Sequence, residues 1–174
     1  MKRLFGFLCV LFLCVSVFGG NPVKILSGKQ AIKTIFSEKE TSVLEFDWKD
    51  ARYDNDKNMK EEWGDKYDYF VKSCEENFQK SFNKESRGLT ISEKQEAKYK
   101  IIVKVKNLDK YFNVMNIVPG HTVKIWGDVT VVSQNGEDMV KIEVEEMKGS
   151  RDSSPEDCYG KAFYILGERI AKLK

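Results

Sequence analysis

The sequence predicts an α+β domain built as a two-layer sandwich, with two helices on one face of a four-stranded, mostly antiparallel mixed sheet. Short segments that alternate apolar and polar residues indicate strands buried on one face only. Two longer segments repeat apolar residues every three or four positions, which is typical of amphipathic helices. The resulting order is β-α-β-β-β-α, and a sheet with one wet face needs helices only on the other face.

The first 19 residues predict a signal peptide. A basic start precedes an uncharged apolar run, Leu4 to Phe18, and Gly19 offers a small residue for a signal peptidase. The run is short for a membrane span, so we expect no stable span after cleavage, and an uncleaved anchor is the alternative. Cys14 follows Leu-Phe-Leu and matches a lipoprotein signal poorly. The 174-residue chain is therefore divided into a signal peptide (1–19), an N-terminal arm or short helix (20–42) and a single domain (43–174).

Cleavage would also remove the net charge. The full sequence has 29 Lys and Arg against 27 Asp and Glu, and the first 19 residues contain two of the basic ones, which leaves 27 against 27. The two signs are interspersed, without the basic stripe of a nucleic-acid binder, so we expect no nucleic-acid partner. The expected location is periplasmic or extracellular, with outer-membrane association as a further option.

Alternation predicts the strands. They are expected over residues 43–48, 98–106, 122–133 and 139–147. The first two are joined through a helix and are expected to be parallel. Asn135-Gly136 between the last two is typical of a tight hairpin turn. Lysines of the second strand and glutamates of the fourth are expected to share the exposed face of the sheet.

Helical spacing predicts the other elements. The clearest helix is expected over 61–84, with Gly88 beyond its end as a left-handed stop. A last helix is expected from Pro155, capped by Ser153 or Ser154. A short helix is indicated in the N-terminal segment by Ala31, Ile32, Ile35 and Phe36, and the alternative is an extended arm packed on the domain.

Three stretches carry a resemblance to known proteins. They are Val43 to Trp48, Phe78 to Asn83 and Tyr99 to Val105. With the element order and the exported start, the chain resembles small exported proteins of unknown function from Gram-negative gut bacteria, whose fold is similar to domains of outer-membrane assembly lipoproteins. The resemblance spans residues 40–172 and implies a fold and a cell-envelope location. It carries over no catalytic residue, and the poor match around Cys14 departs from its lipoprotein members.

The sequence presents no catalytic constellation. His121 is the single histidine and is interpreted as a turn residue after Pro119-Gly120, so a nucleophilic hydrolase has little to build on. Zinc-ligand spacing is lacking, and a partial calcium-loop pattern lacks its turn glycine: Asp54, Asp56, Asn58, Glu62 and Asp65. We expect no metal, no cofactor and a non-enzymatic protein. The alternative is an enzyme or ligand binder that acts on envelope carbohydrate through surface carboxylates.

Two cysteines remain beyond the signal peptide, Cys74 and Cys158. Each lies on or beside the apolar stripe of a predicted helix, and both helices are expected to cover the same face of the sheet. An oxidising compartment would then allow a disulfide that closes a long loop. The alternative is a pair of buried thiols.

The connection 111–118 is unusually apolar for a loop. Trp126 shares the outward parity of its strand, although a bulge at Gly127 could reset that parity. These features predict a surface for an envelope protein partner: Tyr111, Phe112, Val114, Ile117 and Trp126. The alternatives are that the hairpin strands simply run longer, or that residues 21–42 cover Trp126. The leading hypothesis is a non-enzymatic protein-binding or structural module of the cell envelope.

Overall fold

The computed structural model describes residues 21–92, 97–113, 120–149, 154 and 157–173. The helices are α1 (Lys29–Ser37), α2 (Met59–Trp63), the 3-10 turn η1 (Gly64–Lys66), α3 (Tyr67–Glu85) and α4 (Asp157–Ala171). The strands are β1 (Val23–Ser27), β2 (Thr41–Asp47), β3 (Arg52–Tyr53), β4 (Lys57–Asn58), β5 (Thr90–Ile91), β6 (Tyr99–Asn113), β7 (Gly120–Ser133) and β8 (Asp138–Lys148). Of the helices in these ranges, none is both long and apolar enough to cross a membrane.

The strands form one eight-stranded sheet, so the prediction of four strands is wrong. Their order is β1-β8-β7-β6-β2-β5, and β3 adds to β6 while β4 adds to β3. The four predicted strands correspond to β2, β6, β7 and β8, and β2 is parallel to β6 as expected. Of the four missed strands, β3, β4 and β5 have only two residues each, which is too few to show alternation, and β1 has five.

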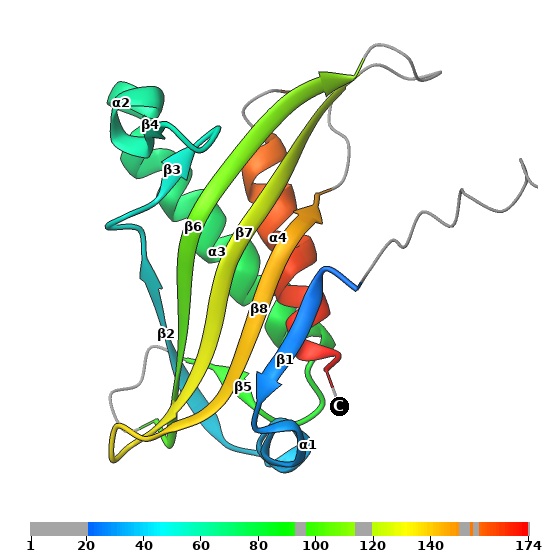
Figure 1. Ribbon diagram of the computed structural model, residues 1–174. Coiled ribbons are helices and arrows are strands. Elements are labelled where there is room, and N and C mark those ends of the chain that lie inside the picture. Colours follow the sequence, from blue (N-terminus) through cyan, green and yellow to red (C-terminus); the bar gives the residue numbers. More distant parts are fainter. Residues whose placement is uncertain (1–20, 93–96, 114–119, 150–153, 155–156, 174) are drawn as a thin grey trace, which may run out of the picture.

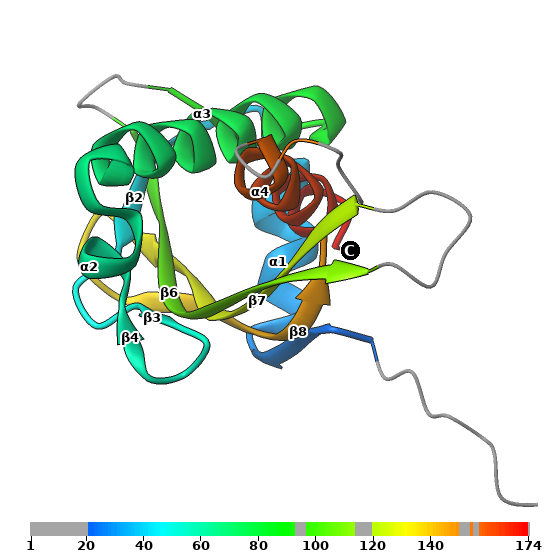
Figure 2. The same cartoon turned by 90° about the horizontal axis from the view of Figure 1, so that it is seen from above.

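The mixed α+β class and the layering agree with the prediction. Figures 1 and 2 show α3 and α4 side by side on one face of the sheet. The short helix expected in the N-terminal segment is α1, which buries Ile32, Ile35 and Phe36. The segment also contains β1, an edge strand that was not predicted and that pairs antiparallel with β8. Asn135-Gly136 makes the predicted turn between β7 and β8, with Gly136 at φ 81°.

The helix predicted over 61–84 is divided into α2, η1 and α3. Gly64 ends α2 with φ 51°, a conformation that glycine adopts without strain. The predicted stop at Gly88 is also wrong, because α3 ends at Glu85. The next residue, Ser86, is extended and donates its N–H to the carbonyl of Phe82 at 2.8 Å. Gly88 instead allows a close approach: a Cβ there would lie 2.6 Å from the carbonyl carbon of Ser37.

The start of α4 matches its prediction only where the structure describes it. The helix begins at Asp157, whose N–H donates to Ser154 Oγ at 3.3 Å, so Ser154 caps this end. Ser153 and Pro155 lie outside the described residues.

One hydrophobic core joins both layers. It contains residues from β1 through α4, with Cys74 and Phe163 fully buried. At the end near α2 it becomes an aromatic cluster, in which the Trp63 and Tyr159 ring centroids are 4.9 Å apart. Burial raises the pKa of the Tyr159 hydroxyl, so this group stays neutral at physiological pH.

The lysines and glutamates expected to share the exposed face of the sheet pair with adjacent strands rather than with each other. The lysines of β6 pair with its neighbours β2 and β7: Lys100 Nζ lies 3.0 Å from Glu45 and Lys106 Nζ lies 2.7 Å from Asp128. The glutamates of β8 are separated from β6 by β7, and Glu145 pairs with Lys24 of β1 instead. Each such exposed pair contributes little to stability.

Candidate functional site

The β6–β7 hairpin extends past the rest of the sheet. Pairing between β6 and β7 continues to Asn113 and Gly120. In contrast, the pairing of β2 with β6 ends at Lys104, and the pairing of β8 with β7 ends at Lys124. Figure 1 shows these two strands reaching beyond the ends of β2 and β8. We call residues 109–113 of β6 and 120–124 of β7 the hairpin arm.

A β-bulge precedes the arm. Val105 pairs with Gly127 and Asn107 pairs with Trp126, so Lys106 is an extra residue in β6. The irregularity expected at Gly127 is also present, because the register of β7 with β8 shifts between Ile125 and Gly127. Trp126 keeps its outward orientation and is half-buried.

The bulge decides which residues of the arm face the helices. Alternation counted from the fully buried Leu108 puts Lys110 and Phe112 on the helix side and Tyr111 on the opposite, outer side. His121 pairs with Phe112 across the hairpin and shares its side. Alternation counted straight through Lys106, as if it were not a bulge, would assign these residues to the opposite sides.

The helix side of the arm presents an aromatic ring to solvent. Phe112 is 54% exposed, and its ring centroid lies 4.9 Å from that of His121. Lys110 Nζ lies 5.3 Å from the centroid of the Tyr159 ring, which links the base of the arm to α4. His121 lies within β7, so its interpretation as a turn residue is wrong.

The outer side of the arm is polar and already paired. Lys124 Nζ lies 5.3 Å from the centroid of the Tyr111 ring and 2.8 Å from Glu146 Oε1. The hydrogen bond to Glu146 raises the pKa of Lys124, so the amine is charged at physiological pH. Tyr111 is half-buried beside this pair.

The predicted partner surface is therefore divided. Tyr111 and Phe112 lie on opposite sides of the arm, and Trp126 shares the outer side with Tyr111. Val114 and Ile117 lie outside the described residues. Among the predicted residues that the structure describes, Phe112 is the exposed one, at 54%.

Sequence reasoning missed that Lys110 and His121 share a side with Phe112. Lys110 follows the apolar alternation of β6 only when the bulge is known, and His121 follows a Pro-Gly pair that suggested a turn. The signal that could have found them is the antiparallel register of the hairpin, which places Phe112 opposite His121.

The calcium-loop residues are used for local structure. Asp54 and Asn55 turn the chain between β3 and β4, with φ of 51° and 64°. Asn58 Oδ1 accepts the N–H of Lys60 at 2.8 Å and caps α2. Across the described ranges, no three His, Cys, Asp or Glu side chains are placed to hold a metal ion.

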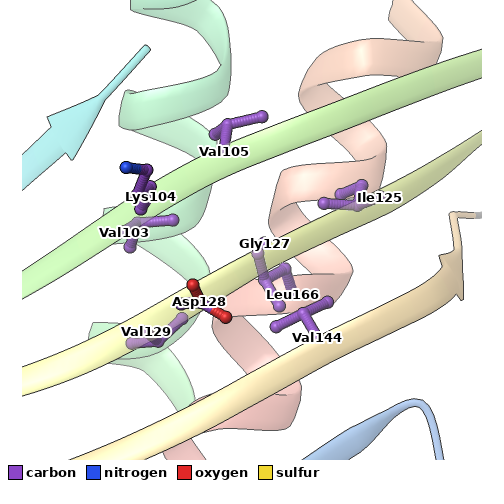
Figure 3. Close-up of a pocket in the computed structure, with 9 residues that line it drawn as sticks. All are labelled: Val103, Lys104, Val105, Ile125, Gly127, Asp128, Val129, Val144 and Leu166. Atoms are coloured by element: carbon purple, nitrogen blue, oxygen red, sulfur yellow. The ribbon is translucent and has the colours of Figure 1, made fainter. Parts of the chain in front are cut away.

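A small hollow without room for a water molecule lies where α4 meets the sheet (Figure 3). Gly127 and Leu166 contribute to its lining, which is mainly aliphatic. Among the lining residues the only carboxylate is Asp128, which is paired with Lys106. This hollow offers no pair of acids for glycoside cleavage.

The disulfide stays a prediction. No disulfide joins Cys74 to Cys158 in the structure, and both thiols are fully buried. Cys158 lies near enough to Cys74 to help raise the pKa of the Cys74 thiol, after burial and Glu75.

No family model and no curated protein matches the sequence. Among solved structures, the fold is similar to the PelC dodecamer from Paraburkholderia phytofirmans, with 12% identity and a TM-score of 0.44 over 87% of this chain and 96% of that chain. A neuraminyllactose-binding hemagglutinin homologue from Helicobacter pylori has 12% identity and a TM-score of 0.40 over 78% and 87%. A minor lipoprotein from Acinetobacter baumannii has 8% identity and a TM-score of 0.35 over 77% and 91%. These likenesses are too distant to carry an argument about function.

Proposed function

We propose that this protein is a non-enzymatic binding module of the cell envelope that contacts a protein partner through the helix side of the hairpin arm. The observation that carries the proposal is Phe112, a large aromatic side chain that is 54% exposed at the end of a hairpin projecting from the sheet. Aromatic residues that can be desolvated on contact dominate the energy of many protein interfaces.

The surroundings of Phe112 support the proposal. His121 fixes one side of the Phe112 ring, and Lys110 is held over Tyr159 of the core. These side chains would therefore lose little conformational entropy when a partner binds. The sequence that continues from the arm, 114–118, is largely apolar and would add to such a contact.

Site-specific photo-crosslinking in cells tests this function. We expect a photoreactive phenylalanine analogue at position 112 to form one dominant adduct, which mass spectrometry then identifies. Leu26 and Tyr69 are exposed to 60% and 59% and provide matched control positions elsewhere on the surface. The partner protein identified in this adduct, once purified, should bind the mature chain directly. F112S should weaken this binding at least about tenfold. The same adducts at all three positions would contradict the proposal.

We also propose that residues 1–19 are removed during export to the envelope. The support is the basic start followed by the short apolar run. N-terminal sequencing of the protein from an envelope fraction should begin just after Gly19, and a product that retains Met1 would contradict the proposal.

A further inference from the structure

The rim of the sheet formed by β2 presents a second surface, away from the hairpin arm. β2 pairs with β6 along its length, but with β5 only at Thr41 and Ser42. Figure 1 shows the remainder of β2 at the margin of the sheet. For the stretch 43–47, the strand pairing that the structure describes is on the β6 side alone.

The backbone groups at this rim belong to alternate residues. Ser42 uses its carbonyl on the outer side, where it accepts the N–H of Ser92 at 2.8 Å, whereas Thr41 accepts from Lys98 beside β6. Because backbone groups alternate between the two sides of a strand, Leu44 and Phe46 point their N–H and C=O groups outward. Within the part of the chain that the structure describes, these groups have no strand partner, and an edge of this kind is a template for another strand.

Side chains from β2 and α3 line this edge on the helix side. Trp48, which follows β2, donates its Nε1–H to Glu75 Oε1 of α3 at 3.2 Å. The rings of Phe46 and Trp48 stack with centroids 5.8 Å apart, and Val71 packs partly buried on the core from α3. The edge is thus flanked by apolar groups and one carboxylate.

Glu75 differs from the other acids along this rim. Glu45 and Asp47 already have Lys100 and Lys104 as ion-pair partners. Burial raises the pKa of Glu75, and the hydrogen bond from Trp48 offsets this only in part; no basic side chain among the described residues contributes. A half-buried carboxylate with one donor has room for a cationic partner, and such charge-assisted hydrogen bonds are strong.

We propose that the outer edge of β2 over Leu44–Asp47 binds an extended peptide segment of a partner protein, and that a Lys or Arg of this segment reaches Glu75. Backbone hydrogen bonds to Leu44 and Phe46 would hold the peptide as an added strand. The charge on Glu75 would select which residue lies beside Trp48. This site does not depend on the hairpin arm, and the two can be tested separately.

Synthetic strand peptides test the proposal on the purified mature chain. The probes are capped nine-residue peptides that alternate Thr and Val, with Lys, Gln or Glu replacing the central Val. We expect the Lys peptide to slow amide hydrogen exchange at Leu44 and Phe46 and to bind at least about tenfold more tightly than the Glu peptide. Fluorescence anisotropy of labelled peptides gives the affinities.

Two substitutions in α3 complete the experiment. E75Q removes the charge, retains an acceptor for Trp48, and should bring the affinities of the Lys and Glu peptides within about twofold of each other. E76Q changes the next residue, which is exposed and paired with Lys72, and should leave the preference intact. The proposal is overturned if no peptide protects Leu44 and Phe46, if the unmodified chain does not prefer Lys over Glu, or if E75Q keeps the preference while remaining folded by circular dichroism.

Discussion

Glu75 carries its charge in surroundings that disfavour it. Burial raises its pKa above the ordinary 4.5, and the Trp48 hydrogen bond lowers it by less. The folded state therefore binds this proton more tightly than the unfolded state. The contribution of Glu75 to the free energy of unfolding therefore falls as the pH rises from about 4.5 through its pKa in the folded state. Above that pKa, the destabilisation by the buried charge has reached its full size.

We expect E75Q to raise the free energy of unfolding at pH 7, because the amide has no charge to desolvate and can still accept from Trp48. The gain over the unmodified chain should shrink as the pH falls toward 4.5, where Glu75 becomes protonated. Urea unfolding at the two pH values measures the difference. E76Q, at an exposed position, should change little at either pH, and a loss of stability in E75Q at pH 7 would contradict the interpretation.

The contact between α3 and α4 depends on two glycines one heptad apart. A Cβ on Gly160 would meet the ends of side chains, with Ser73 Oγ at 2.6 Å and Asn77 Nδ2 at 2.8 Å. A Cβ on Gly167 would fall on the backbone carbonyl of Phe78 as well as on a serine hydroxyl. Side-chain ends can rotate away, but a helix backbone cannot, so the two positions differ in tolerance.

We expect G167A to lower the free energy of unfolding by about 1–3 kcal/mol, because α3 and α4 must separate to admit the methyl group. G160A should stay within about 1 kcal/mol of the unmodified chain, since alanine favours the helix and the nearby side chains can move. Urea denaturation of both variants provides the comparison, and each is the control for the other. Equal losses of stability in the two variants would contradict the distinction between a contact with backbone and a contact with side-chain ends.

The elements show which patterns a sequence can reveal. Alternation over six or more residues predicted β2, β6, β7 and β8, and helical spacing predicted α3 and α4. Two-residue strands have no period, and the bulge at Lys106 has no local signature among alternating lysines. The long stripe from Trp63 to Phe82 hid the break at Gly64, because the apolar residues on either side continue the spacing.

One core spans the whole molecule from β1 to α4, and both thiols lie inside it. Burial raises the pKa of Cys74 well above its ordinary value, which further suppresses its reactivity. Neither thiol is accessible unless the core opens.

We expect both cysteines of the mature chain to resist alkylation when folded and to react together as the protein unfolds. Intact mass measured along a urea series, without reductant, should show two added groups with a midpoint that matches circular dichroism. Samples treated with reductant first are the control. Alkylation only after reduction would instead support the predicted Cys74–Cys158 disulfide.

At the same scale, the two proposed surfaces differ in how far the sequence indicates them. The apolar stretch beginning at Tyr111 identified the end of the hairpin, and Phe112 is exposed there. The β2 edge could be recognised only from the order of the strands in the sheet. Leu44 and Glu75 are 31 positions apart in the chain, and in the sequence they belong to an ordinary buried strand and to the solvated face of a helix. Edges are a property of the assembled sheet rather than of any one segment.

The extra residue at Lys106 also bears on how this chain could change over evolutionary time. Val105 and Asn107 keep consecutive partners on β7 with Lys106 left over, so deletion of that codon would leave every other pair in place. The bulge accommodates one more residue in β6 than in the facing part of β7, between the body of the sheet and the hairpin arm. A lineage could therefore gain or lose a residue here without re-registering the hairpin, and the arm could diversify while the core is inherited unchanged.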